Sequence, residues 1–243
     1  MSSQIYFRMA GYVITLVMHI TNLIAMRITI KGANITQGTL EDIGIRTFKS
    51  MEYRYLTTWN VVNQINYAIL GLVCDILTIK NRKKKNYKLP PLLRSTRDII
   101  FDGIVLPNTF VVSSLFWTLF LYDRSLVYPE FIDLIVTKAS NHVIHTAIVP
   151  VVSWEMMFRP RKEPKSHLRN ISLLTLYMIL YCFVLHFTHY QKGVWLYPIL
   201  DVLQGVHFIL FHLCVAAMGY FYYFAQWKLN KIIHRESNTK KIK

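Results

Sequence analysis

Charged residues are scarce in this sequence, and acidic residues are scarcer than basic ones. Only 17% of the 243 residues are charged, against about a quarter in an ordinary soluble domain. The formal net charge is nevertheless +15, because 28 Lys and Arg face 13 Asp and Glu. With 9 Gly, 8 Pro and 3 Cys, the chain is not a collagen, a disordered chain or a disulfide-rich secreted mini-protein. Its 53% hydrophobic residues favour a membrane protein, with a basic nucleic-acid binder as the alternative.

Six apolar segments are each close to the roughly twenty residues that a helix needs to cross ~30 Å of hydrocarbon. They run over residues 9–26, 56–79, 99–121, 134–158, 171–190 and 199–225. No clear small-residue cleavage site follows the first segment, so we interpret it as a retained helix rather than a signal peptide. The pattern predicts an all-α polytopic membrane protein, with a single six-helix transmembrane domain over residues 1–225 and a basic cytosolic tail over residues 226–243.

The basic residues are distributed unevenly between these segments. Six crossings place the N-terminus, the second and fourth loops and the tail on one side, which carries 20 Lys and Arg against 7 on the other, with Lys138 inside the fourth segment. The positive-inside rule then puts both termini in the cytosol. The run Lys80-Asn-Arg-Lys-Lys-Lys85 directly follows a helix end and lacks the interleaved aromatics of single-strand binders. We therefore expect these loops to contact anionic membrane headgroups and no nucleic acid.

Short motifs give information on the subcellular localisation of the protein. The chain ends in Lys240-Lys-Ile-Lys243, which has the Lys-Lys-x-x form of a retrieval signal for the endoplasmic reticulum. A basic tail also produces this form by chance, so both the endoplasmic reticulum and the plasma membrane remain open. Two glycosylation sequons occur, Asn34-Ile-Thr36 on the predicted outer side and Asn170-Ile-Ser172 on the cytosolic side. The cysteines lie inside apolar segments and imply no disulfide framework: they are Cys74, Cys182 and Cys214.

Two polar stripes lie inside the predicted membrane helices, where polar groups are costly and mark a site or face the bundle interior. Each stripe falls within about 60° of one line along its helix. One consists of Thr57, Asn60, Gln64, Ala68, Gly71 and Asp75. The other consists of Lys138, Asn141, His142, His145, Val149, Val152 and Met156. A stripe of this kind also arises where helices simply pack together.

The predicted topology gathers several reactive side chains in the outer half of the membrane: Thr57, His142, His145, His186 and Asp201. Two chemistries suit this set. In one, a Thr hydroxyl attacks an acyl carbon while a His removes its proton. In the other, the histidines and Asp201 hold a metal ion whose bound water attacks. A third possibility is a non-enzymatic regulator or lipid-binding protein, and these residues alone leave the choice open.

A longer series of motifs is more specific. It comprises Phe116-Trp117, Tyr122-Asp-Arg124, Tyr128-Pro129, Asn141-His-x-x-His145-Thr146 with Pro150 and Glu155, and Trp195-Leu-Tyr-Pro198. In this order the motifs resemble the family of the androgen-induced protein and the androgen-dependent TFPI-regulating protein. The resemblance implies a six-helix membrane hydrolase that cleaves fatty acid esters of hydroxy fatty acids with a Thr nucleophile and a His base, and it implies no cofactor.

The resemblance also assigns residues. The family's aromatic-(Leu/Met)-Thr motif falls on Tyr55-Leu56-Thr57, which makes Thr57 the implied nucleophile, with Thr58 as a rival if the register is off by one. The second His of the Asn-His-x-x-His string makes His145 the implied base. We expect Asn60 and Asn141 to donate to the oxyanion, and Asp201 or His186 to orient His145. Relative to the family, about four extra residues separate Thr188 from Gly193 on the predicted outer side.

Depth in the membrane poses a problem for this pair. Thr57 starts its predicted helix, whereas His145 lies near the middle of its own. Straight helices would separate them by about 10 Å in depth at 1.5 Å per residue. Either the second helix begins earlier, near Met51, and dips, or the fourth helix tilts.

Overall fold

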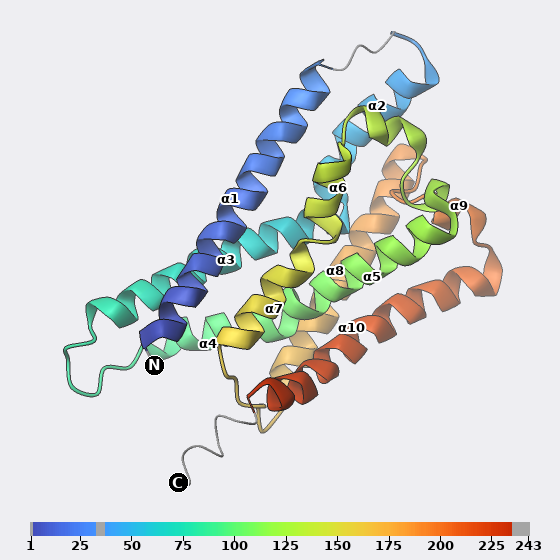
Figure 1. Ribbon diagram of the computed structural model, residues 1–243. Coiled ribbons are helices and arrows are strands. Elements are labelled where there is room, and N and C mark those ends of the chain that lie inside the picture. Colours follow the sequence, from blue (N-terminus) through green and yellow to red (C-terminus); the bar gives the residue numbers. More distant parts are fainter. Residues whose placement is uncertain (1, 33–36, 235–243) are drawn as a thin grey trace.

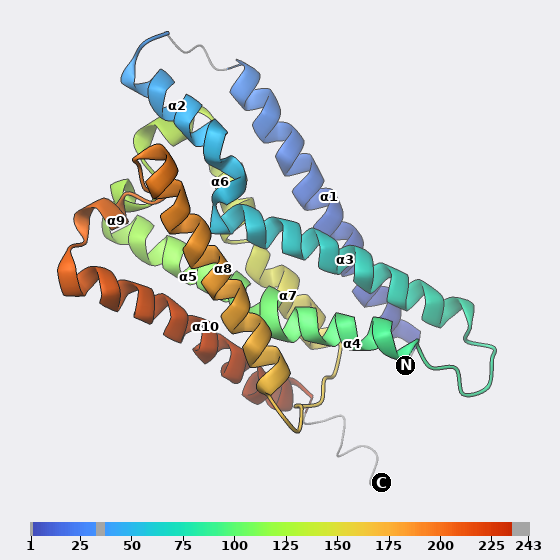
Figure 2. The same ribbon diagram turned by 180° about the vertical axis from the view of Figure 1, so that it is seen from behind.

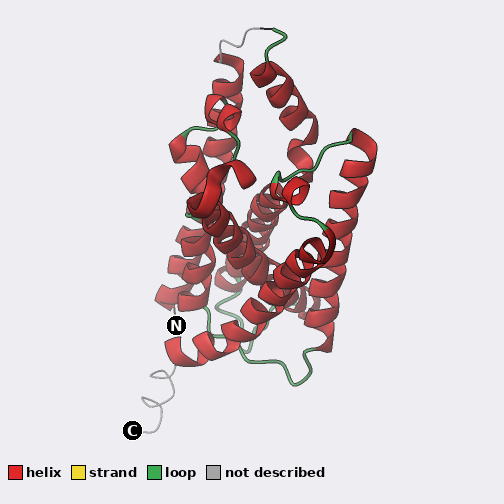
Figure 3. Ribbon diagram, turned by 90° about the vertical axis from the view of Figure 1, so that its right-hand side faces the viewer, coloured by secondary structure: helices red, strands yellow, loops and turns green. Residues whose placement is uncertain are grey.

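The computed structural model describes residues 2–32 and 37–234, and every regular element in this part of the chain is helical (Figure 3). The α-helices are α1 (Ser2–Gly32), α2 (Leu40–Met51), α3 (Leu56–Lys80), α4 (Pro91–Ile100), α5 (Leu106–Asp123), α6 (Lys138–His145), α7 (Ile148–Phe158), α8 (Leu168–Lys192), α9 (Ile199–Val202) and α10 (Gly205–Ile233). Short 3-10 helices cover Glu52–Arg54 (η1), Arg124–Leu126 (η3) and Glu130–Leu134 (η4), and a π-helical turn, η2 (Phe101–Val105), joins α4 to α5. The predicted all-α class is confirmed.

Five helical stretches in the described part of the chain are long and apolar enough to cross a membrane. They cover residues 3–32, 56–80, 91–126, 168–192 and 205–233. Large apolar side chains point outward from them, and Ile14, Ile179 and Leu213 are 60%, 62% and 60% exposed. Such faces are costly in water and suit lipid. The chain is therefore a multi-pass integral membrane protein, while six crossings and cytosolic termini stay predictions.

The two ends of the described chain lie at the same end of the molecule. In Figure 1 the start of α1 and the end of α10 are both at the bottom. α7 passes in front of α5 in Figure 1 and α8 behind it, and Figure 2 shows the reverse order. α5 is thus the central helix of the bundle. Of the two sequons and the retrieval motif, Asn34 and Lys240–Lys243 lie outside the described residues, and Asn170 is buried in the first turn of α8.

The fourth predicted helix, residues 134–158, is wrong as a single helix. The α-helix begins only at Lys138, where the Thr137 side chain caps it by accepting from the Ser140 N–H, and the chain turns at residues 146–147 before α7 begins. Pro150 explains the break, because proline has no N–H to donate and its ring clashes with the carbonyl four residues earlier, that of Thr146. The sixth predicted helix is also divided, into α9 and α10.

Helix α2 lies in a segment that the sequence analysis treated as a loop. Thr39 caps it by accepting from the Asp42 N–H, and Asp42 in turn accepts from Arg46 at 2.8 Å and from the Gly38 N–H at 3.0 Å. These bonds, that of Arg46 foremost, hold the pKa of Asp42 below its ordinary value. Gly44 lets α2 approach η4, because a Cβ there would stand 3.0 Å from the Phe131 ring. α2 and η4 thus pack together at the upper end of the bundle (Figure 1).

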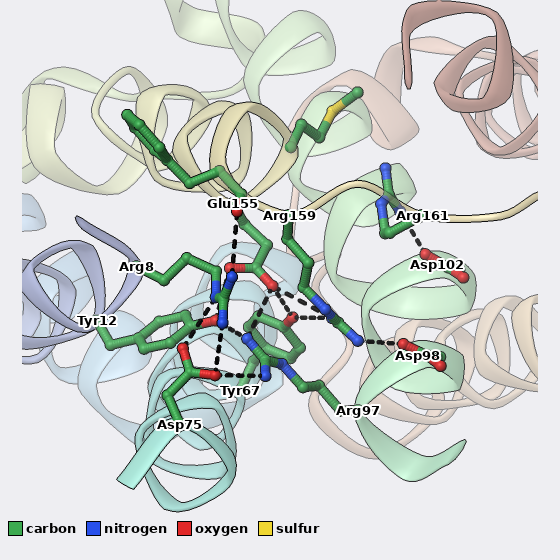
Figure 4. Close-up of polar contacts among 12 residues, drawn as sticks. Arg8, Tyr12, Tyr67, Asp75, Arg97, Asp98, Asp102, Glu155, Arg159 and Arg161 are labelled. Atoms are coloured by element: carbon green, nitrogen blue, oxygen red, sulfur yellow. Dashed lines mark hydrogen bonds and ion pairs between the residues drawn. The ribbon is translucent and has the colours of Figure 1, made fainter. Parts of the chain in front are cut away.

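A buried network of charges joins the helices at the opposite end (Figure 4). Asp75 on α3 accepts from Arg8 on α1 at 2.9 Å and from Arg97 on α4 at 3.0 Å. Glu155 on α7, only 3% exposed, accepts from the hydroxyls of Tyr12 and Tyr67, each at 2.6 Å. The network connects α1, α3, α4 and α7. Asp75, at the end of the first polar stripe, thus faces the interior of the bundle.

Two further guanidinium groups extend this network. Arg159 contacts Glu155 at 3.2 Å and also pairs with Asp98. Arg161 pairs with Asp102 in the π-helical turn, so the loop after α7 is fixed against the α4–α5 junction (Figure 4). Carboxylates and guanidinium groups are therefore matched inside this end of the bundle, as burial of charge requires.

Candidate active site

Thr57 and His145 meet inside the molecule. The Thr57 Oγ1 atom lies 3.2 Å from the His145 Nε2 atom, which is within hydrogen-bonding distance. Thr57 is in the first turn of α3 and His145 is the last residue of α6. The depth problem disappears for two reasons. α2 and η1 precede α3, so Thr57 does not mark the outer edge of the bundle, and α6 begins four residues later than predicted.

The other side of the His145 ring is fixed by Asn141. The His145 Nδ1 atom lies 2.8 Å from the Asn141 side-chain oxygen and 3.2 Å from the Asn141 backbone carbonyl. A carbonyl oxygen only accepts, so Nδ1 carries the proton and the Nε2 lone pair accepts from the Thr57 hydroxyl. The ring also stacks on Phe116 and is 5% exposed. The tautomer and orientation are those that a general base for Thr57 requires.

The N-terminus of α3 brings backbone donors next to the Thr57 hydroxyl. The Leu56 N–H donates to the hydroxyls of Tyr181 and Tyr197, each at 3.0 Å, and the first bond of helical type runs from the Trp59 N–H to the Tyr55 carbonyl. The N–H groups of Thr57 and Thr58 therefore belong to the first turn, whose donors have no acceptor within the helix. Such donors favour negative charge.

Thr58 differs from Thr57 in the direction of its hydroxyl. The Thr58 Oγ1 atom donates to the Glu52 carbonyl at 2.7 Å, so it is committed to η1 rather than to a histidine. The geometry thus favours Thr57 over its neighbour in the choice that the sequence register left open.

A cavity of about 440 Å³ opens beside the pair. Its polar wall residues include Thr57, His145 and Asn108, and most of the wall is apolar, contributed by α1, α2, α5, α8 and α10. A pocket of this size with a few convergent polar groups is typical of a small-molecule site. Its apolar wall suits hydrocarbon chains.

Asn60 lies one turn after Thr57 on α3 and is fully buried. Its side-chain oxygen accepts from Asn108 at 3.2 Å and from Thr109 at 3.0 Å, whereas its Nδ2 atom has no partner among the described residues. Asn60 therefore joins α3 to α5, and Asn108 presents the amide that reaches the cavity wall. The sequence analysis did not identify Asn108, because it lies in neither of the two polar stripes.

The remaining predicted residues lie elsewhere. His142 is exposed, 3.1 Å from the Thr146 hydroxyl, and stacks on Trp117. His186 lies beside Cys182 on α8, and Asp201 is exposed on α9. The expectation that Asp201 or His186 orients His145 is therefore wrong, because Asn141 occupies that position. Asn141 uses only its side-chain oxygen for His145, and its NH₂ group can still donate, so its role at the oxyanion stays a prediction.

The metal site that the sequence analysis offered as an alternative is not assembled either. In the described residues, the side chains that converge closely enough to hold a metal ion do not include His142, His145 or Asp201. Both ring nitrogens of His145 already have partners within the protein. The histidines that the sequence analysis grouped with Asp201 are thus not assembled into one ligand set.

Comparison with protein families now supplies the classification. A family model described as "FAR-17a/AIG1-like protein" matches residues 14–231, which include every helix from the body of α1 to most of α10. The chain belongs to this family. The FAR-17a/AIG1-like match covers Thr57, Asn141 and His145, and it confirms the resemblance drawn from the motifs.

Individual relatives in the FAR-17a/AIG1-like family are moderately similar. The androgen-dependent TFPI-regulating protein of Mus musculus is 33% identical over 159 residues, 65% of this chain and 66% of the relative. That of Mesocricetus auratus is 32% identical over 178 residues, 73% of this chain and 74% of the relative. The androgen-induced gene 1 protein of Homo sapiens is 23% identical over 200 residues, 78% of this chain and 84% of the relative. The match to the mouse relative spans just under two thirds of its length. No solved structure matches the chain.

Proposed function

We propose that this protein is a membrane hydrolase that cleaves fatty acid esters of hydroxy fatty acids, with Thr57 as the nucleophile and His145 as the general base. The single observation that carries the proposal is the 3.2 Å contact between Thr57 Oγ1 and His145 Nε2 on the wall of an apolar cavity. A hydroxyl becomes an effective nucleophile when an oriented base can take its proton. Asn141 orients the base through Nδ1, so the three residues form a nucleophile–base–orienter series.

The first half of the reaction transfers the acyl group. As Thr57 Oγ1 forms a bond to the ester carbonyl carbon, its proton passes to His145 Nε2, and the carbonyl oxygen becomes an oxyanion. The N–H groups of Thr57 and Thr58 at the start of α3 are the donors we assign to this oxyanion. When the intermediate collapses, the bond to the alkoxy oxygen breaks and His145 returns the proton to it. The hydroxy fatty acid leaves, and the other fatty acid remains esterified to Thr57.

The second half releases that acid. Water attacks the acyl carbon while His145 removes one of its protons, and the same donors stabilise the second oxyanion. Collapse breaks the bond to Thr57 Oγ1, which recovers a proton from His145. The free fatty acid leaves and the enzyme returns to its starting state. No step needs an oxidant, a reductant or a cofactor.

The cavity supports a lipid ester as the substrate class. Its wall is mainly apolar and draws on helices of both faces of the bundle, so hydrocarbon on both sides of the ester finds apolar surface. The pattern of basic loops further supports contact with anionic lipids on the cytosolic side. We propose residence in the endoplasmic reticulum or the plasma membrane.

The proposal is tested on purified protein in nanodiscs with an ester of a hydroxy fatty acid and with a fluorophosphonate probe that labels activated hydroxyl nucleophiles. We expect Thr57→Ala and His145→Ala to lower kcat by roughly 10³-fold or more, and both to abolish labelling. Thr58→Ala is the matched control, because its hydroxyl points to Glu52, and it should retain labelling.

The outcomes separate the competing functions. Labelling that survives Thr57→Ala and disappears in Thr58→Ala would move the nucleophile by one residue. Hydrolysis that survives in both His145→Ala and Thr57→Ala would refute the Thr–His mechanism and favour a metal-bound water. A folded protein that hydrolyses no ester would favour a non-enzymatic lipid-binding or regulatory protein.

A further inference from the structure

A second group of reactive side chains lies between α8 and α10. Cys182 and His186 stand one turn apart on α8, and His212 approaches them from α10. One potential ligand atom from each side chain lies within 4.8 Å of the others. Within residues 2–32 and 37–234, no other three Cys, His, Asp or Glu side chains converge in this way. None of the three is hydrogen-bonded to Thr57 or His145, so the proposed reaction steps do not use them.

Both histidines donate from Nδ1 to a backbone carbonyl one turn earlier, and the His186 Nδ1 atom also lies 3.6 Å from the Cys182 Sγ atom. The His186 Nδ1 atom lies 2.8 Å from the Cys182 carbonyl, and the His212 Nδ1 atom lies 2.8 Å from the Phe208 carbonyl. Because a carbonyl only accepts, each Nδ1 carries the proton and each Nε2 keeps its lone pair. Histidines that bind metals are commonly oriented by this kind of bond from the other ring nitrogen.

The free nitrogen of His212 is in an unfavourable position without a ligand. Its Nε2 atom is buried and has no hydrogen-bond partner in the described part of the chain. A buried acceptor left unpaired costs about 1–3 kcal/mol. Simple helix packing would be served better by an apolar side chain at this position. The unpaired lone pair beside a thiol and a second imidazole instead indicates a bound ligand.

Aromatic rings pack against one side of the Cys182–His186–His212 group, and the large cavity lies on another side. The His186 ring meets Trp195 edge to face at 5.3 Å, and the His212 ring lies 4.6 Å from that of Phe208. Cys182 and His212 both reach the wall of the large cavity. The aromatic rings thus limit rotation of the imidazoles, and the cavity provides a path by which an ion or water could enter.

We propose that Cys182, His186 and His212 form a binding site for a Zn²⁺-type ion that joins α8 to α10. One thiolate and two imidazoles suit a borderline-soft cation, and the absence of a carboxylate from this group disfavours Mg²⁺ and Ca²⁺. A tetrahedral ion with bonds of about 2.0–2.3 Å holds its ligand atoms roughly 3.3–3.6 Å apart. The His186 ring must therefore turn so that Nε2 faces the ion, and the ligand atoms have up to roughly 1.5 Å to close. Water from the cavity takes the fourth position.

Binding involves a balanced proton transfer. The Cys182 thiol loses its proton to solvent as the S–metal bond forms, while the two neutral imidazoles bind without losing one. The ion stabilises the contact between α8 and α10, and it takes no part in the Thr57–His145 reaction. The proposal thus adds a structural metal site to the molecule and does not depend on the proposed hydrolysis.

Cobalt is the probe, because tetrahedral Co²⁺ gives visible bands and a thiolate ligand adds a charge-transfer band in the near ultraviolet. The full chain, purified in nanodiscs and stripped with a chelator, is titrated with Co²⁺ and then with Zn²⁺ as competitor. We expect one Co²⁺ per chain with both types of band, displaced by one equivalent of Zn²⁺, and a higher Tm in the metal-bound protein.

Four variants make the assignment specific. Cys182→Ser should remove the charge-transfer band, and His212→Ala should weaken Co²⁺ binding at least tenfold. Cys214→Ser and His207→Ala are matched controls, because these exposed side chains of α10 lie outside the group, and they should leave binding unchanged. A charge-transfer band that persists in Cys182→Ser, unchanged affinity in His212→Ala, or no stoichiometric binding to the folded wild type would overturn the site.

Discussion

The imidazole of His145 lies flat against the ring of Phe116, with the ring centroids 3.4 Å apart and the planes inclined by 5°. Phe116 comes from the central helix α5 and His145 from the end of α6, so the stack fixes the base relative to the middle of the bundle. The stack leaves both ring nitrogens free for the hydrogen bonds in its plane, to Asn141 on one side and Thr57 on the other. Phe116 is therefore a positioning residue for the proposed base.

Replacing Phe116 tests this arrangement. Phe116→Leu keeps an apolar side chain but removes the flat surface, so we expect kcat to fall roughly tenfold or more, since small displacements of a catalytic group are costly. KM should change little. Steady-state kinetics on the ester substrate provide the measurement. Trp117→Leu is the control, because Trp117 stacks on His142 and not on His145; an equal loss in both variants would contradict a specific role for Phe116.

Asn141 offers a second test through its bond to the base. Asn141→Leu removes the side-chain acceptor at Nδ1, so the ring can turn or change tautomer, and we expect kcat to fall by about 10²-fold or more. Asn141→Asp keeps an acceptor at the same place and should recover much of the activity. Rescue by Asp but not by Leu would show that the acceptor matters. Equal activity in the two variants would refute the orienting role.

Tyr181 and Tyr197 share one donor, the Leu56 N–H, and lie 3.0 Å from each other through their hydroxyls. Either Tyr→Phe change alone leaves the donor one acceptor, so we expect each to cost less than about 0.5 kcal/mol of unfolding free energy. The double change leaves a half-buried N–H without a protein acceptor and should cost about 1 kcal/mol. Reversible unfolding of the wild type, the two single variants and the double variant measures these free energies. Strictly additive effects would show that the two hydroxyls do not share this donor.

Glu155 is the most demanding member of the charge network, because Arg97 and Arg159 both depend on it. Glu155→Gln keeps the size of the side chain and removes its charge, which leaves excess positive charge in a buried position. We expect a loss of about 3–5 kcal/mol of stability. Unfolding measurements on Glu155→Gln and on the exposed control Glu130→Gln provide the comparison. Loss of activity without loss of stability would instead give Glu155 a catalytic role.

The lowered pKa of Asp42 predicts that the stability of α2, at the opposite end of the molecule from the charge network, depends on pH. Its pKa is lowered in the folded protein by Arg46 and the Gly38 N–H, so the ionised form is favoured by folding. This stabilisation is complete above the ordinary Asp value of about 4 and is lost as the pH falls through the lowered pKa. The protection of the α2 amides, measured as the ratio of the intrinsic to the observed exchange rate at each pH, should therefore fall on acidification. In Asp42→Asn exchange should already be faster at neutral pH, and an unchanged acid response in that variant would exclude Asp42 as the cause.

Much of the fold is visible in the sequence because lipid imposes a simple rule. A long apolar run such as residues 56–79 must be helical, since an unpaired backbone in hydrocarbon costs too much, and α3 matches it within one residue at its end. The breaks within the predicted helices could not be predicted from the hydropathy pattern. Hydropathy windows do not register the clash of Pro150 with the Thr146 carbonyl, and they pass over α2, whose amphipathic pattern lies in a polar segment.

The candidate site, like the fold, could be predicted from the sequence only in part. The nucleophile and base were implied by motifs, and their stripes could be drawn from helical periodicity alone. The partner of His145 was assigned wrongly because Asp201 and His186 are close to it in predicted depth but lie on other parts of the bundle. Asn108 and Phe116 support the site from α5, whose rotation about its own axis is fixed only by packing against its neighbours.

The sequence by itself determined that the chain is a helical membrane protein and which family it resembles, and the resemblance implied Thr57 and His145 as nucleophile and base. Only the tertiary structure decided that these residues meet, because the distance between Thr57 and His145 depends on where α6 begins, on the break before Pro150 and on the extra helix α2 above α3. It likewise brought Cys182 and His186 together with His212, since nothing in the spacing of α8 specifies which face of α10 it will contact. Spacing along one helix fixes a face, whereas a contact between two helices depends on the packing of both.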